Sequence, residues 1–136
     1  MPILQVKISR HPDSKLGSII AEGLLERTTR ILHKKRNLTS IALEYVSPES
    51  WIVGGSSLAA QGKNSFYLEI KVVAGTNTKD ELAAYIADCF AFFGAVLGDL
   101  HNESYIYVQE VKADAYGFGG VTQERRYIEG NALPAH

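Results

Sequence analysis

The chain begins with Met1-Pro2, and a proline in this position could perform acid–base chemistry. If Met1 is removed, Pro2 carries a free secondary amine whose ring fixes the direction of the nitrogen lone pair. Desolvation and nearby cations lower the pKa of an amine, so such a nitrogen can be neutral near pH 7 and abstract a proton next to a carbonyl. The alternative is that Pro2 merely starts an edge strand, where its missing N–H costs nothing. If Met1 is retained, the Pro2 nitrogen is an amide without basicity.

Basic and phenolic side chains elsewhere in the chain could stabilise the enolate oxygen that such a proton transfer produces. Lys35 and Arg36 lie at the end of a predicted helix. Their charges could instead face solvent and complement the helix dipole. Tyr105 and Tyr107 alternate along a predicted strand, where their rings could serve packing. The sequence therefore offers two classes of substrate-binding residue and does not choose between their members.

Two aromatic residues each begin an aromatic-x-x-Gly-Gly segment, Trp51 in residues 51–55 and Tyr116 in residues 116–120. Their rings could wall a pocket and exclude water, or fill an interface between subunits. The glycine pairs indicate unusual backbone angles and not a phosphate-binding loop, since no helix follows a strand and a glycine-rich turn in the required way.

These two segments belong to an internal repeat. Residues 4–8 match residues 68–72 at an offset of 64 (68 minus 4). The aromatic segments match at an offset of 65 (116 minus 51). The repeated order is strand, helix, strand, and a single crossover helix implies parallel strands that are joined right-handedly. The sequence therefore predicts two tandem β-α-β units.

Two such units predict an α/β (α+β) fold, with a four-stranded mixed sheet and two helices on one face. Alternating apolar residues of the strands should face the helices, and the polar residues between them should face water or a hydrated centre between subunits. We expect a single domain that covers residues 1–136, with units at about 2–57 and 66–121 and a C-terminal tail at 122–136. The predicted strands cover residues 2–8, 40–46, 66–73 and 105–111.

The two predicted helices have recognisable features. The first ends in the basic cluster of residues 33–36, and the second opens with a capping box at residues 78–81. Phe92 and Val96 lie outside the apolar stripe of the second helix, so we expect them to face a partner. The stripe itself should pack on the sheet, and it comprises Leu82, Tyr85, Ile86, Cys89, Phe90, Phe93 and Leu97.

Composition excludes several classes of function. The 136 residues carry a net charge of −1 and are 46% hydrophobic, so broad attraction to nucleic acid or to an anionic membrane is not expected. Cys89 is the only cysteine, and no apolar run is long enough to cross a bilayer, which together favour a cytoplasmic protein. The histidines show no metal-ligand spacing, so we expect no metal and no cofactor. They are His11, His33, His101 and His136.

A proline after Met1, two β-α-β units and a Gly-Gly turn after the second strand of each unit together resemble the tautomerase superfamily. Members with two units per chain include macrophage migration inhibitory factor, cis-3-chloroacrylic acid dehalogenase and fused proteins similar to 4-oxalocrotonate tautomerase. Residues 38–55 are similar to the short-chain members, and residues 105–107 are similar to the inhibitory factor and the dehalogenase. The resemblance covers nearly the whole chain.

The resemblance implies a homotrimer with active sites at subunit boundaries, each built around the N-terminal proline. The second unit has Phe66 where the first has Pro2, so one working site per chain is expected. Trp51 aligns with the aromatic position that shapes the pocket in short tautomerases, and Arg36 aligns with a lysine near the substrate in cytokine-like members. The pocket tyrosine of those members aligns with Tyr105, and Tyr107 aligns with a neighbouring tyrosine of the dehalogenase.

The chain also departs from the family pattern. The second-strand arginine of the short tautomerases is Ala42 here. The two carboxylate-binding arginines of the dehalogenase align with Val73 and Thr76, and its acidic water activator aligns near Ala115, next to Asp114. These differences weaken the interpretation of the chain as a dehalogenase or as a 5-carboxymethyl-2-hydroxymuconate isomerase, another two-unit member of the superfamily. They leave proton transfer unaffected.

The sequence thus predicts a cofactor-independent keto–enol tautomerase of a small 2-oxo acid or its enol, with Pro2 as general base and acid. One alternative is a hydratase, dehalogenase or decarboxylase of the same superfamily, which would use a protonated Pro2. The other is a catalytically idle trimer that binds or signals.

Overall fold

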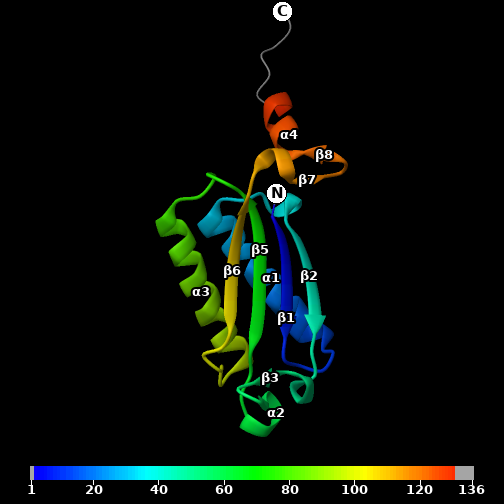
Figure 1. Cartoon of the computed structure of the whole chain (residues 1–136), viewed down its shortest axis with the longest axis vertical. Coiled ribbons are helices and arrows are strands. Elements are labelled where there is room, and N and C mark those ends of the chain that lie inside the picture. Colours follow the sequence, from blue (N-terminus) through cyan, green and yellow to red (C-terminus); the bar gives the residue numbers. More distant parts are fainter. Residues whose placement is uncertain (1, 131–136) are drawn as a thin grey trace, which may run out of the picture.

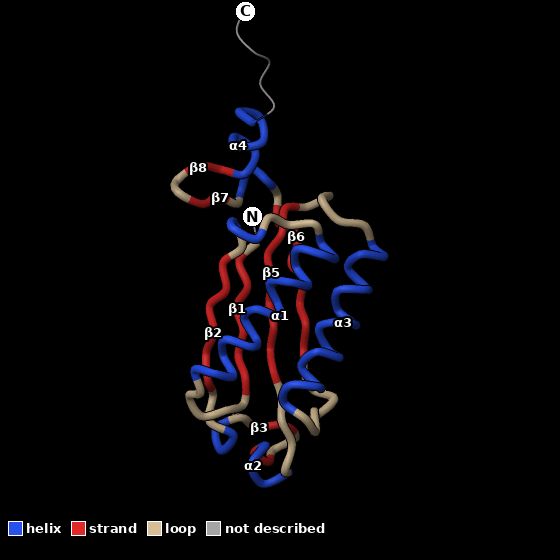
Figure 2. Tube along the Cα trace, turned by 180° about the vertical axis from the view of Figure 1, so that it is seen from behind, coloured by secondary structure: helices blue, strands red, loops and turns tan. Residues whose placement is uncertain are grey.

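A four-stranded sheet with two long helices on one face forms the body of the chain in the computed structural model, which describes residues 2–130 (Figures 1 and 2). The strand order is β2-β1-β5-β6. β1 pairs in parallel with β2, β5 pairs in parallel with β6, and the two central strands β1 and β5 are antiparallel. The predicted mixed sheet of two β-α-β units is therefore confirmed. Its elements are β1 (Ile3–Ile8), α1 (Ser14–Leu32), β2 (Ser40–Tyr45), β5 (Phe66–Val73), α3 (Lys79–Leu97) and β6 (Tyr105–Val111).

Short elements follow the second strand of each unit in the same order. After β2 come η2 (Pro48–Ser50), β3 (Ile52–Val53), β4 (Ser56–Ser57) and α2 (Leu58–Gln61). After β6 come η3 (Ala113–Ala115), β7 (Gly117–Phe118), β8 (Val121–Thr122) and α4 (Gln123–Gly130), while η1 (Arg36–Leu38) precedes β2. The tail predicted from residue 122 thus begins inside a hairpin and continues as a helix, and its residues 131–136 lie outside the described residues, as does Met1.

The Gly-Gly pairs make the tight turns of the two hairpins. The turn between β3 and β4 has φ angles of +62° at Gly54 and +86° at Gly55, and the turn between β7 and β8 has +60° at Gly119 and +80° at Gly120. Only glycine adopts such angles without steric cost, which explains why each repeat carries two.

Residues of the sheet alternate between a dry face and a wet face, as predicted. Leu4, Val6 and Ile8 are buried against the helices, and the same holds for Leu68 and Ile70. The opposite face is polar, and its side chains are exposed or half-buried. They are Gln5, Lys7, Ala42, Glu44, Glu69, Lys71, Tyr107 and Gln109. The main hydrophobic core therefore lies between the sheet and the helices.

The helix pair corrects one detail of the prediction. Phe92 packs between α3 and α1, where the Arg27 guanidinium lies 4.3 Å from the centre of its ring and the absence of a side chain at Gly23 leaves room for it. Val96 also packs against the core. The prediction that these two residues face a partner is wrong. The predicted core stripe includes Ile86 and Phe90, but these are 40% and 37% exposed, and Phe92 and Val96 pack against the core in their place.

The remaining residues of the α3 stripe are confirmed as core. Tyr85, Cys89 and Phe93 are fully buried. The Tyr85 hydroxyl and the Thr28 hydroxyl lie 2.9 Å apart and share a hydrogen bond between the helices. Burial raises the pKa of the Cys89 thiol to about 12, which fits an inert packing role for this residue.

Candidate active site

Pro2 is buried at the end of the sheet where β1 begins, beneath the β7–β8 hairpin and α4 (Figure 1). Its carbonyl oxygen accepts a hydrogen bond from the Ser40 backbone N–H at 3.1 Å, which fixes the entry into the strand. Ile3 then pairs with Ser40 on one side and with Lys71 on the other. Two neighbouring strands therefore hold the Pro2 position in place.

Tyr116 is brought to Pro2 by the turn after β6. Its ring is half-buried, and burial raises the pKa of its hydroxyl. The backbone amide of Ile3, which hydrogen-bonds to that hydroxyl, acts in the opposite direction. The Tyr116 hydroxyl therefore lies beside the residue that directly follows Pro2.

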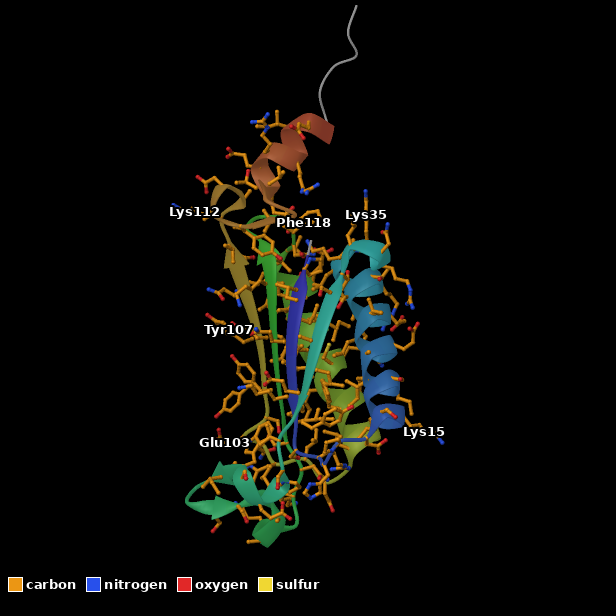
Figure 3. All side chains as sticks on the ribbon, turned by 90° about the vertical axis from the view of Figure 1, so that its right-hand side faces the viewer. Lys15, Lys35, Glu103, Tyr107, Lys112 and Phe118 are labelled. Atoms are coloured by element: carbon orange, nitrogen blue, oxygen red, sulfur yellow. The ribbon has the colours of Figure 1, made fainter. Side chains whose placement is uncertain are left out.

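The two predicted cations, Lys35 and Arg36, follow α1 at the same end of the sheet (Figure 3). Both terminal nitrogens of Arg36 hydrogen-bond to the Glu22 carboxylate, at 2.8 and 2.7 Å. Lys35 forms no ion pair with any residue in the range 2–130 and lines a cavity. The structure thus offers Lys35 as the available cation and leaves Arg36 paired on the surface.

That cavity has a volume of about 510 Å³ and lies between the C-terminal segment and the ends of α1 and β5. Two of its polar residues, Gln123 and Arg126, were not predicted from the sequence. The Arg126 guanidinium lies 3.7 Å from the centre of the Phe118 ring and donates a hydrogen bond to the Phe118 carbonyl at 2.9 Å. The lining comprises Lys35, Val73, Thr76, Ala113, Gln123, Glu124, Arg126 and Tyr127.

Trp51 and Tyr105 lie at the opposite end of the sheet. Tyr105 pairs with Tyr67, which pairs with Lys7 near the far end of β1. Because β1 has six residues, about 20 Å of strand separates this end from Pro2. Within one subunit, therefore, neither Trp51 nor Tyr105 contributes to a pocket around Pro2.

A second, larger cavity of about 830 Å³ occupies that far end and is lined by Trp51, Tyr105, His101 and Glu103, among others. The Tyr105 hydroxyl donates to the Glu103 carboxylate, and this contact raises the pKa of the hydroxyl. Tyr107 lies between the two ends, exposed on the polar face of the sheet (Figure 3). The predicted site residues therefore fall into a Pro2 group and a distant group.

Residues 2–130 contain no cluster of three His, Cys, Asp or Glu side chains that could hold a metal ion. No helix in this part of the chain is long and apolar enough to span a bilayer. The Tyr116 hydroxyl lies beside Ile3, and the Lys35 ammonium and the Arg126 guanidinium line the cavity at the same end of the sheet.

The chain matches no protein-family model and no curated protein by sequence. Among solved structures it is similar to R7 fused 4-OT, where 4-OT stands for 4-oxalocrotonate tautomerase, described as an asymmetric trimer (TM-score 0.77, 18% identity, 92% of this chain and 98% of that chain). It is also similar to Pt0534 inactivated by 2-oxo-3-pentynoate (0.79, 10%, 91% and 98%) and to a macrophage migration inhibitory factor homologue from Prochlorococcus marinus (0.71, 18%, 88% and 97%). At these identities the likeness establishes the fold.

Proposed function

We propose that this chain, which has the fold of the tautomerase superfamily, is a cofactor-independent keto–enol tautomerase of a small 2-oxo acid or its enol. The Pro2 amine is the general base and acid. The observation that supports this most is the burial of Pro2 at the strand end where the Tyr116 hydroxyl meets the backbone of Ile3. A cation, Lys35, and a cavity of about 510 Å³ lie at the same end.

In the proposed mechanism, removal of Met1 exposes the Pro2 nitrogen as an amine in a desolvated position. Desolvation disfavours the ammonium form, so the nitrogen is ready to accept a proton. It takes the proton from the enol hydroxyl or from the α-carbon of the substrate and returns it to the other position. The Tyr116 hydroxyl donates a hydrogen bond to the enolate oxygen, and the Lys35 ammonium offsets the negative charge of the bound acid as a whole.

In the proposed enzyme, a second subunit supplies the site residues that lie far from Pro2. Trp51, Tyr105 and Tyr107 reach a Pro2 pocket only if another copy of the chain supplies them, because about 20 Å of β1 separates the ends within one chain. We propose a homotrimer in which the polar sheet faces meet, by analogy with R7 fused 4-OT, which is described as a trimer. Arg36 keeps its predicted substrate-binding role in this proposal only if it leaves Glu22.

Analytical ultracentrifugation of the purified chain tests the assembly. We expect a single species with three times the chain mass of 14.9 kDa, because the half-buried Lys71–Glu69 ion pair (3.3 Å) on the sheet face suits a hydrated centre between subunits. A monomer at micromolar concentration would remove Trp51, Tyr105 and Tyr107 from the proposed site.

Steady-state enolisation of phenylpyruvate tests the proposed reaction. We expect a chain that has lost Met1 to accelerate the interconversion of phenylpyruvate and its enol without added metal or cofactor. The sample's intact mass must first show that Met1 is absent. A fully processed chain that leaves the buffer rate unchanged would favour the idle trimer over the enzyme.

A further inference from the structure

We infer that the C-terminal helix α4 forms a carboxylate-binding subsite in which Arg126 and Gln123 act together with Lys35. The subsite would hold the carboxylate of the 2-oxo acid while the carbonyl end lies toward Pro2 and Tyr116. The role of the subsite in turnover rests on the proposed function, but its affinity for a small carboxylate does not.

The first support is the charge of the cavity. Arg126 and Lys35 both line it, and neither forms an ion pair with a described residue. The neighbouring Arg125, in contrast, is paired with Glu129 at 3.0 Å. One carboxylate, Glu124, also belongs to the lining, but its side chain is exposed and solvent weakens its interactions. The lining thus carries two cations and one exposed carboxylate, and the cations are in excess.

The second support is a pair of unsatisfied donors on the same lining. The Gln123 side-chain NH₂ and the Arg126 Nε–H are buried and have no hydrogen-bond partner among the described residues. Gln123 is only 8% exposed. A buried donor without an acceptor is unfavourable, and a native structure usually supplies the acceptor. A carboxylate in the cavity has several lone pairs and would supply acceptors to both donors once their side chains turn toward it.

The third support is that Arg126 is held in place before any ligand binds. Its guanidinium lies over the Phe118 ring and donates to the Phe118 carbonyl. Gly119 has no side chain, and a Cβ there would lie only 2.8 Å from Arg126 Nη2. The planar guanidinium is therefore oriented by the β7–β8 hairpin, and a fixed guanidinium loses little freedom when it binds a carboxylate.

The subsite is also close to the reacting end. Extending the β1–β5 register by one residue places Pro2 opposite Val72, and the next residue, Val73, lines the cavity. The Gln123 backbone N–H donates to the Tyr116 carbonyl at 2.7 Å, which joins the start of α4 to the tyrosine beside Pro2. The start of α4 and the start of β1 are therefore linked through Tyr116, and the inference places the substrate carboxylate at the subsite with the carbonyl end toward Pro2.

Calorimetric titration with benzoylformate tests the subsite directly. Benzoylformate is a 2-oxo acid without an α-hydrogen, so it binds without enolising, and its methyl ester is the matched uncharged probe. At low ionic strength the wild-type chain should bind the acid about tenfold or more tightly than the ester. Arg126→Gln, which keeps a planar group near Phe118 but removes the charge, should abolish most of that preference.

Three controls make the result decisive. Arg125→Gln removes a paired cation one residue away and should leave both affinities within about twofold of wild type. Pro2→Ala should retain the preference for the acid. Lys35 is exposed, so Lys35→Gln should fold normally and reduce the preference even if Arg126→Gln does not fold.

Unchanged benzoylformate affinity in both Arg126→Gln and Lys35→Gln would overturn the inference. The proposed function can fail separately. A processed wild-type chain that binds benzoylformate through Arg126 but does not enolise phenylpyruvate would support the subsite and contradict the tautomerase proposal.

Discussion

Pro2→Ala is expected to lower kcat/KM for phenylpyruvate enolisation by about 100-fold. The alanine variant keeps a terminal amine of ordinary basicity, so the loss reflects position more than base strength. Without the pyrrolidine ring the lone pair is no longer fixed, and a small misplacement of a catalytic group costs about this much. Pro2 is buried between two neighbouring strands, which suits a reaction that depends on its position.

The second variant to compare is a chain with an N-terminal extension, in which Met1 stays attached to Pro2. Its Pro2 nitrogen is an amide, so basicity is lost while the proline ring remains. We expect a loss of about 10²- to 10⁴-fold, the usual contribution of general acid–base catalysis. Equal kcat/KM values for the wild type, Pro2→Ala and the extended chain would remove Pro2 from the mechanism.

Phe93→Ala is expected to lower the free energy of unfolding by about 3–5 kcal/mol, the range for a phenylalanine that is deleted from a core. Phe93 is fully buried, and its ring stacks on Phe66 with the centres 3.9 Å apart. Phe66 occupies in the second unit the place that Pro2 has in the first, so the second unit has core packing where the first has the proposed base. Guanidinium-induced unfolding at matched chain concentration measures the loss.

Phe90→Ala is the matched control on the same helix. Phe90 is 37% exposed, and its ring centre lies 6.0 Å from that of Phe66. Phe90→Ala should therefore lower the free energy of unfolding clearly less than Phe93→Ala. Equal losses for Phe93→Ala and Phe90→Ala would contradict the assignment of the core to the Tyr85, Cys89 and Phe93 side of α3. An unchanged unfolding midpoint for Phe93→Ala would contradict it as well.

The long elements could be predicted from the sequence because local chemistry marks them. Period-two alternation in residues 4–8 and 68–72 predicted two strands, and both have their apolar residues buried on the helix side. The predicted capping box is present, since the Thr78 hydroxyl accepts from the Glu81 N–H and the Glu81 carboxylate accepts from the Thr78 N–H. These signals depend only on residues a few positions apart.

The short elements could not be predicted in the same way. Two-residue strands such as β3 and β7 are too short for periodicity to show, and only their Gly-Gly turns are visible in the sequence. The helix α4 has eight largely polar residues and no apolar stripe, so the sequence pattern predicts only a tail there. Arg126 and Gln123 were missed for that reason, although they line the cavity near Pro2.

Contacts between residues that are far apart in the sequence could not be predicted either. Nothing in the sequence indicates that Arg36 pairs with Glu22, fourteen positions earlier, because the pairing depends on how the chain turns after α1. The separation of Trp51 and Tyr105 from Pro2 likewise follows from strand register, which places them at opposite ends of one sheet. The resemblance to the tautomerase superfamily identifies Trp51 and Tyr105 as candidate pocket residues, but within a single subunit they do not contact Pro2.

Covalent labelling by 2-oxo-3-pentynoate tests the central claim, an unblocked and uncharged Pro2 nitrogen, most directly. Pt0534 is inactivated by this compound. In this chain we expect the Pro2 nitrogen to add to the alkyne carbon remote from the carbonyl while the adjacent carbon gains a proton, so the mass increases by that of the whole reagent. After digestion with trypsin, the added mass should lie on the peptide of residues 2–7, with Met1 absent and with activity lost in proportion. Full inactivation with an unmodified 2–7 peptide, or a peptide that still carries Met1 in active protein, would contradict the account.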